Sequence, residues 1–214
     1  MFAPDYHFTP EGAIFLSEED TLQNRDSFVN YLEHYVQREG IEGVIVWLVE
    51  STDFFNAPCS TAYHLNITGG LALHSMKVFQ IFNTLCEMFS PEFPKESRAI
   101  CALLHDVCKV NVYRPALKSR KTGEYWPNGK PKWEDYLAYD FDDPFPYGHG
   151  EKSVYLIMKH MPLTDEEAMA IRWHMGSYDS SAKSDTRTLG NATTKYPVIS
   201  LLHAADLIAT SQGF

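Results

Sequence analysis

The segment ALLHDVCKV, residues 102–110, places three polar side chains in an otherwise apolar stretch of the chain. Apolar residues recur at helical spacing from residue 97 to residue 110, so the segment is expected to end a buried helix. His105, Asp106 and Lys109 cannot be buried there alone, because an unpaired buried polar group or charge costs several kcal/mol. Their partner must come from elsewhere in the chain.

The same helical periodicity recurs along most of the 214 residues. The predicted helices cover residues 21–37, 43–52, 71–89, 97–110, 148–161 and 196–211. A further helix is expected to begin at a capping box, residues 164–167, and to stop near Gly176. A loop rich in Ser, Asp and Thr should then lead to the last helix, which has Pro197 in its first turn.

Residues 111–147 differ from these segments, because they are rich in Lys, Arg, Tyr and Trp. The turn signal Pro127-Asn128-Gly129 lies between stretches of alternating polarity, which predicts an exposed β-hairpin. Its cationic and aromatic side chains are Arg114, Lys118, Arg120, Lys121, Lys130, Lys132, Tyr113, Tyr125, Trp126 and Trp133. Two interpretations stay open: a lid or platform that stacks on a nucleotide, or a solvated hairpin whose aromatics pack onto the helices.

These patterns predict the fold class. We find no internal repeat, low-complexity tract or domain linker, so one mostly α-helical domain with a small inserted β-hairpin is expected over residues 1–214. Its core should lie at about residues 60–210, with the helices of residues 20–52 packed on it and the insertion at about residues 111–147. A hydrophobic content of 44% is ample for such a core.

Composition narrows the classes of partner. The formal net charge of −10 argues against binding duplex DNA through the overall field, whereas a small anionic substrate can still bind a local basic pocket. No basic and apolar leader opens the sequence, and no apolar run is long enough for a membrane span, so we expect a soluble, cytoplasmic protein without a membrane partner. The four cysteines include no CxxC pair and are expected to be reduced core residues.

Several predicted helices share polar residues that interrupt or adjoin their apolar surface. These residues are His74, His105, Asp106, His149, His174 and Asp206. Each alone is more commonly a hydrogen-bonded helix residue, but four imidazoles and two carboxylates facing the interior of one bundle form a set that binds one or two transition-metal ions. Neighbouring residues on a helix rise only about 1.5 Å, so His105 and Asp106 can approach one ion, and the two oxygens of Asp106 can bridge two.

In order and context, this set resembles the HD-domain superfamily of metal-dependent phosphohydrolases, whose signature is H…HD…H…H…D. The match spans roughly residues 60–210 and includes the contexts GGLxxHS around His74 and HDxxK around His105. The resemblance implies an HD-type helical bundle. It also implies hydrolysis of a phosphomonoester or phosphodiester of a nucleotide-like substrate by a metal-activated water, without a protein nucleophile.

The resemblance further implies how the ligands are shared. The first ion would be held by His74, His105, Asp106 and Asp206, and Asp106 would bridge to a second ion held by His149 and His174. A histidine-rich shell favours one or two divalent transition-metal ions, Fe or Mn first, with Zn, Ni, Co or Mg as further candidates.

Two residues near this set have candidate catalytic roles besides Asp106. Lys109, in the HDxxK context, is expected to bind substrate phosphate or pair with a site carboxylate, against the alternative of a lysine reaching solvent from the helix end. His64 is either a substrate contact or proton donor, as similar H…GGL…H segments of HD-domain 3′-to-5′ exoribonucleases suggest, or a histidine that orders its loop.

Two other function classes fit the same residues. Some HD-fold proteins with this six-ligand pattern are di-iron oxygenases, which O2-dependent turnover would distinguish from a hydrolase. A metal-stabilised binding module without turnover is the other alternative.

Overall fold

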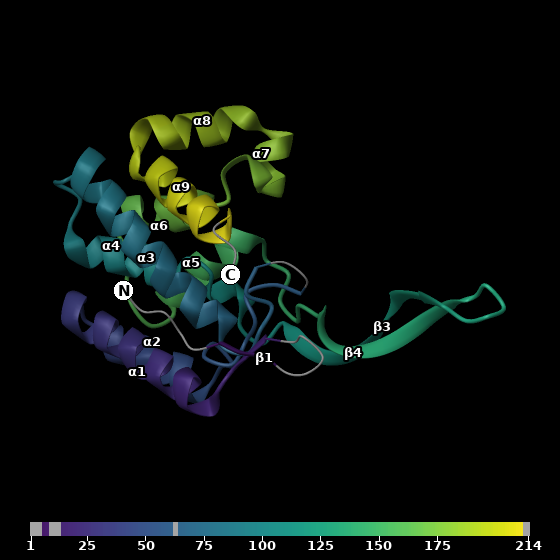
Figure 1. The fold of residues 1–214 in the computed structure, drawn as a ribbon. Coiled ribbons are helices and arrows are strands. Elements are labelled where there is room, and N and C mark those ends of the chain that lie inside the picture. The colour runs from purple at the N-terminus through teal and green to yellow at the C-terminus, as the bar shows by residue number, and fades with distance from the viewer. Residues whose placement is uncertain (1–5, 9–13, 62–63, 212–214) are drawn as a thin grey trace.

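Helices make up most of the described residues, 6–8, 14–61 and 64–211, of the computed structural model (Figure 1). The helices are α1 (Glu18–Tyr35), α2 (Ile41–Glu50), α3 (Gly70–Phe89), α4 (Lys95–Leu104), α5 (His149–Met158), α6 (Asp165–Trp173), α7 (Ser180–Ser184), α8 (Thr186–Lys195) and α9 (Val198–Ser211). Strands β1 (Tyr6–Phe8) and β2 (Ile14–Leu16) form one antiparallel pair, and β3 (Tyr113–Tyr125) and β4 (Pro131–Phe141) form another. The predicted class, mostly α with a small hairpin, is confirmed.

The main apolar core joins α1 to α6 and α9 and includes the apolar side chains of residues 102–110. Fully buried side chains enter it from α1, α2, α5, α6 and α9 as well as from α3 and α4, for example Phe28, Leu48, Ile157 and Leu202. Helix α3 packs against α1, α4 and α9 and carries His74 on its buried surface. None of the helices in the described ranges has the length and apolar character needed to cross a membrane.

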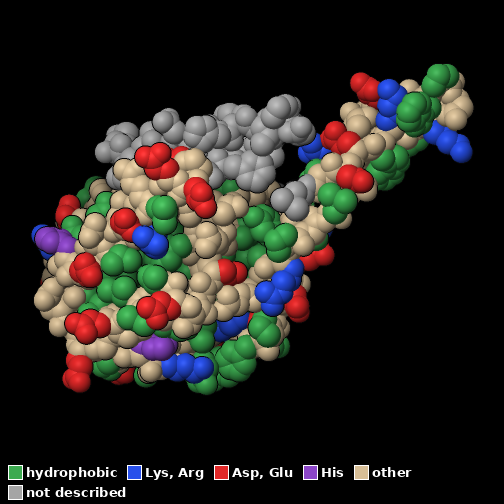
Figure 2. Space-filling model, turned by 90° about the horizontal axis from the view of Figure 1, so that it is seen from below, with side chains coloured by type: hydrophobic (Ala, Val, Ile, Leu, Met, Phe, Trp, Pro, Cys, Tyr) green, Lys and Arg blue, Asp and Glu red, His purple; other side chains and the backbone are tan. Residues whose placement is uncertain are grey.

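The predicted hairpin is present and projects from the helices as an arm (Figures 1 and 2). Its turn is closed by the Trp126 amide, which donates to the Lys130 carbonyl at 2.8 Å, and Gly129 takes the positive φ of +77°. At the far end Tyr125, Trp126 and Trp133 are 66%, 54% and 58% exposed. These three aromatics are solvated, whereas Tyr113 at the base of the hairpin is buried in the core, so packing onto the helices holds for Tyr113 and not for the other three.

The boundary after α4 differs from the sequence prediction. The helix expected over residues 97–110 ends at Leu104, and Val107–Lys109 form one turn of 3-10 helix, η1. Val107 and Val110 are buried in either conformation, so apolar spacing could not detect the tighter turn. Asp106 has φ −106° and ψ 15°. It therefore does not share with His105 the helical geometry that the sequence predicts for these two neighbours.

The loop predicted after Gly176 is also wrong, because α7 and α8 occupy most of it. Composition misled the prediction: the same Asp residues that suggest a loop act as helix caps here. Asp179 accepts from the amides of Ser181 and Ala182, and Asp185 accepts from the amide of Arg187. The capping box at Thr164 and Glu167 is confirmed at the start of α6.

A buried ion pair ties the end of α1 to α6. Arg38 donates to both carboxylate oxygens of Glu167 at 2.6 and 2.8 Å, and also to Glu96 at 3.1 Å. Glu167 is fully buried, and although burial alone would raise its pKa, hydrogen bonding from Arg38 holds that pKa below the usual range. This carboxylate therefore contributes stability above about pH 4.5, its unfolded value, and loses it as the pH falls through its lower folded pKa.

We expect Arg38→Met to lower the free energy of unfolding by about 3 kcal/mol at pH 7, because it leaves a buried carboxylate without its cation. The deficit should shrink below pH 4.5 as Glu167 becomes protonated. Urea denaturation at pH 7 and below pH 4.5 measures this difference in the free energy of unfolding. Arg25→Met, which removes the exposed pair with Asp26, is the matched control and should change stability little. An equal, pH-independent loss in both variants would contradict this account.

Candidate metal centre

The six predicted ligands converge in the bundle from five parts of the chain. They are His74 in α3, His105 and Asp106 directly after α4, His149 at the start of α5, His174 directly after α6, and Asp206 in α9. His74, His105 and His174 are fully buried and Asp106 is 2% exposed. The side chains of Asp206 and His149 are 15% and 31% exposed, so the centre opens toward solvent on the His149 side.

Asp106 lies in the middle of this set. Its Oδ1 faces His149 Nε2 at 2.9 Å and His174 Nε2 at 3.6 Å. Its Oδ2 faces His105 Nε2 at 3.4 Å and His74 Nε2 at 3.8 Å. The two oxygens are therefore divided between two pairs of imidazoles, and His74 also lies 3.1 Å from Asp206 Oδ1.

Backbone carbonyls orient two of the histidines. His105 Nδ1 donates to the Ala102 carbonyl at 2.8 Å, and His174 Nδ1 donates to the Ile171 carbonyl at 2.7 Å. With the N–H on Nδ1, a neutral ring carries its lone pair on Nε2. Both Nε2 atoms are buried and have no hydrogen-bond partner among the described residues. Metal-binding histidines characteristically bind the ion through one ring nitrogen while the other ring nitrogen donates its N–H to a carbonyl or carboxylate.

The contact between His174 and Asp106 is the most informative. Burial lowers the pKa of His174, so its ring is neutral and Nε2 is an acceptor that faces a carboxylate oxygen, also an acceptor. Two buried acceptors that face each other need a cation or a proton between them. Two ligands each about 2.1 Å from one tetrahedral cation lie about 3.4 Å apart, close to the spacings that Asp106 makes with His105 and His174.

The pKa shifts of Asp106, His74 and His105 show how these groups are protonated without a cation. Burial would raise the pKa of Asp106, but Lys109 and His105 hold it well below the usual range, so the carboxylate stays ionised. Burial lowers the pKa of His74, whereas Asp106 outweighs burial at His105 and raises that pKa. In the absence of a metal the carboxylate thus attracts protons and the Lys109 ammonium as substitute cations.

Groups of three ligands that can hold a metal ion recur through this centre. Their ligand atoms lie within 4.8 Å of one another, and the groups are His74, His105 and Asp206; His105, Asp106 and His174; and Asp106, Cys108 and His149. These buried groups can hold a metal ion. The sequence resemblance implies that only Asp106 is shared between the two ions. In the structure His105 also belongs to two of the groups.

The structure places Lys109 inside the centre. Its Nζ lies 2.7 Å from Asp106 Oδ2, and the side chain is only 17% exposed, which is inconsistent with a lysine that reaches solvent. In the 3-10 turn that begins after Asp106, residues three apart are eclipsed, which brings the two side chains together. Of the two expected roles, pairing with a site carboxylate is the one the structure contains.

His64 lies at the edge of the centre. Its ring centroid is 5.0 Å from that of His74, and its Nε2 is 3.3 Å from Cys59 Sγ. Burial, with His74 and Lys109 nearby, lowers its pKa to about 4. The ring is therefore neutral at pH 7, which suits a ligand or an acceptor better than the proton donor suggested by sequence.

Two cysteines in the centre were missed as site residues. All four cysteines are free and buried, as expected for reduced core residues, but Cys59 contacts His64, and Cys108 Sγ lies 3.5 Å from His149 Nδ1. Cys108 follows His105 by three residues, which is a spacing that could have pointed to a shared site. Cys59 belongs to an irregular segment whose approach to the centre leaves no periodic signal.

Close packing of α5 and α6 brings His149 beside His174, with ring centroids 5.2 Å apart. Gly150 allows this approach, because a Cβ there would lie 2.1 Å from the Arg172 carbonyl oxygen. On the other side, His203 Nδ1 donates to the His174 carbonyl at 2.6 Å and fixes the chain just after α6.

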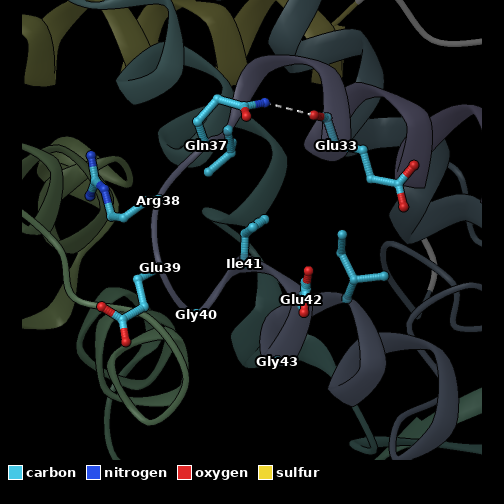
Figure 3. Close-up of a pocket in the computed structure, with 10 residues that line it drawn as sticks. Glu33, Gln37, Arg38, Glu39, Gly40, Ile41, Glu42 and Gly43 are labelled. Carbon is cyan, nitrogen blue, oxygen red and sulfur yellow. Dashed lines mark hydrogen bonds between the residues drawn. The ribbon is translucent and has the colours of Figure 1, made fainter.

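A pocket of about 560 Å³ lies elsewhere, at the turn between α1 and α2 (Figure 3). Its lining includes Glu33, Gln37, Glu39 and Ile41, and none of the residues of the candidate metal centre. Arg38, which also borders it, is already paired with Glu96 and Glu167. The pocket offers no set of convergent reactive groups, so the buried centre is the better functional candidate.

Comparison of the chain with protein-family models, curated proteins and solved structures gives no match. The chemistry of the centre therefore has to be inferred from its own atoms.

We expect Asp106→Asn to remove bound metal, because the amide cannot supply two anionic ligand oxygens to neighbouring ions. Elemental analysis of protein purified without chelator should show the loss. Chelation should lower the melting temperature of the unaltered protein, since metal binds only the native state, but should leave the variant unchanged. Asp179→Asn alters an equally buried carboxylate that pairs with Arg172 and should retain metal. Full occupancy in Asp106→Asn would refute the centre.

Gly150→Ala should push α5 away from α6 and lower stability by about 1–3 kcal/mol through overpacking. It should reduce metal content by separating His149 from His174 while leaving the His74, His105 and Asp206 group in place. Gly190→Ala is the control, because a Cβ there meets no atom within 4 Å. If metal content is the same in both variants, the α5–α6 contact does not assemble the centre.

Proposed function

We propose that this chain is a metal-dependent phosphohydrolase of the HD type, acting on a phosphomonoester or phosphodiester of a nucleotide-like substrate. The observation that carries the proposal is the division of Asp106 between two pairs of imidazoles, one of which includes a neutral Nε2 that faces a carboxylate oxygen. Such an arrangement suits one or two divalent cations shared through the carboxylate.

The donor set narrows the metal. Imidazole nitrogens outnumber carboxylates, which favours Fe, Mn, Zn, Ni or Co over Mg. When bound, such ions supply Lewis acidity toward phosphoryl oxygens and lower the pKa of a coordinated water to near neutrality.

The protein groups themselves support attack by water rather than by a side chain. The two thiols next to the centre are buried, and burial raises the pKa of Cys59 to about 12, so that this residue is a protonated, poor nucleophile. Lys109 holds a positive charge against Asp106 inside the centre, where it can also attract the negative oxygens of a phosphate.

An exposed aromatic cluster close to His149 in the chain supports a substrate with an aromatic base. Phe145, Tyr147 and Tyr155 are 40%, 54% and 41% exposed, and their ring centroids lie 5.3–5.4 Å apart. Tyr147 precedes His149, the first residue of α5, by two residues, and Tyr155 belongs to α5. Aromatic faces stack on nucleobases without strong sequence preference.

The test is the double variant His149→Ala/His174→Ala, assayed on an activated phosphodiester and a panel of nucleotides. Metal content should fall while one ion remains, and hydrolysis should fall by more than about 100-fold, because even loss of an outer partner of a metal ligand costs about 10–100-fold. His34→Ala/His160→Ala replaces two histidines outside the centre and should keep activity. Metal-loaded protein that hydrolyses no phosphate ester, or turnover that requires O2, would overturn the proposal.

A further inference from the structure

Cys59, His64 and His74 form a further group of metal-type ligands beside the centre. One ligand atom from each lies within 4.8 Å of the other two. Cys59 and His74 are fully buried and His64 is half-buried. Neither the superfamily signature nor the division of Asp106 accounts for this group.

One buried nitrogen of His74 points to a ligand on the second side of the ring. Nε2 lies 3.1 Å from Asp206 Oδ1, whereas Nδ1 is buried and has no hydrogen-bond partner among the described residues. A buried polar nitrogen without a partner costs about 1–3 kcal/mol. A cation held by Nε2 beside Asp206 and His105 leaves Nδ1 unaccounted for.

A thiol–imidazole hydrogen bond between Cys59 and His64 does not supply the missing partner of His74. It accounts for Nε2 of His64 and leaves Nδ1 of His64 and Nδ1 of His74 without partners among the described residues. Lys109 Nζ, 3.6 Å from Cys59 Sγ, is a donor that can stabilise a thiolate ligand. One sulfur and two imidazole nitrogens form the kind of soft donor set that selects Zn²⁺ and related ions over Mg²⁺.

We propose that Cys59, His64 and His74 bind an additional thiophilic divalent cation, of the Zn²⁺ or Co²⁺ class, next to the Asp106 centre. Cys59 binds as the thiolate and His74, where it serves two cations at once, binds as the imidazolate, and each releases its proton to solvent. The subsite rests on these ligands alone and does not depend on phosphate hydrolysis.

Cobalt loading of the whole protein tests the subsite without an activity assay, because Co²⁺ gives a near-ultraviolet charge-transfer absorption only when a thiolate binds it. The unaltered protein should show this band on titration with Co²⁺, and Cys59→Ser should abolish it and lower the bound cobalt by about one ion per chain. His64→Ala should weaken the band. Cys86→Ser is the control and should keep the band, because Cys86 is a buried thiol outside the ligand groups formed by the described residues.

Several results would overturn the proposal. One is Co²⁺ bound by the unaltered protein without the band, and another is a band that survives in Cys59→Ser. A band lost in Cys108→Ser but not in Cys59→Ser would place the thiolate in the Asp106, Cys108 and His149 group instead. Circular dichroism of each variant confirms folding, and His64→Ala gives an independent readout at a half-buried position.

Discussion

The buried carboxylate of Asp106 is the interaction on which the rest of the centre depends. It is ionised, 2% exposed, and in contact with four imidazoles and one ammonium group from four parts of the chain. A charge in that position costs several kcal/mol unless it is compensated. The polar interior of the bundle can therefore be understood as the shell that compensates Asp106.

Helix ends and close helix packing position the side chains around Asp106. His105 and His174 stand at helix ends, where each satisfies a last-turn carbonyl through Nδ1 and turns Nε2 inward. Gly150 permits the close approach of α5 that brings His149 to the same carboxylate. The helices thus hold buried Nε2 lone pairs without partners among the described residues. Unsatisfied groups of this kind cost stability and are typical of sites that bind a ligand.

Sequence alone could predict most of the helices, the hairpin turn and the six polar residues that converge in the bundle, because apolar period, turn residues and interrupting polar residues are local signals. It could not predict the 3-10 turn after α4, since Val107 and Val110 are buried in either geometry. The prediction of a loop after Gly176 is wrong because Asp residues are common both in loops and at helix N-caps, and Asp179 and Asp185 are N-caps. Cys59 and His64 both lie in irregular backbone before α3, and Lys109 lies in η1, so no periodic pattern predicts that Cys59 contacts them.

The most direct test of the central claim is anomalous diffraction from crystals of the metal-loaded protein, recorded on both sides of the metal absorption edge. A cation between Asp106 and the inward-facing histidines should give a peak about 2.0–2.2 Å from Asp106 Oδ1 and from His174 Nε2. A second peak on the Oδ2 side would show that the carboxylate bridges two ions. Metal found only at surface residues, with His174 Nε2 and Asp106 still facing each other without a cation, would contradict the account.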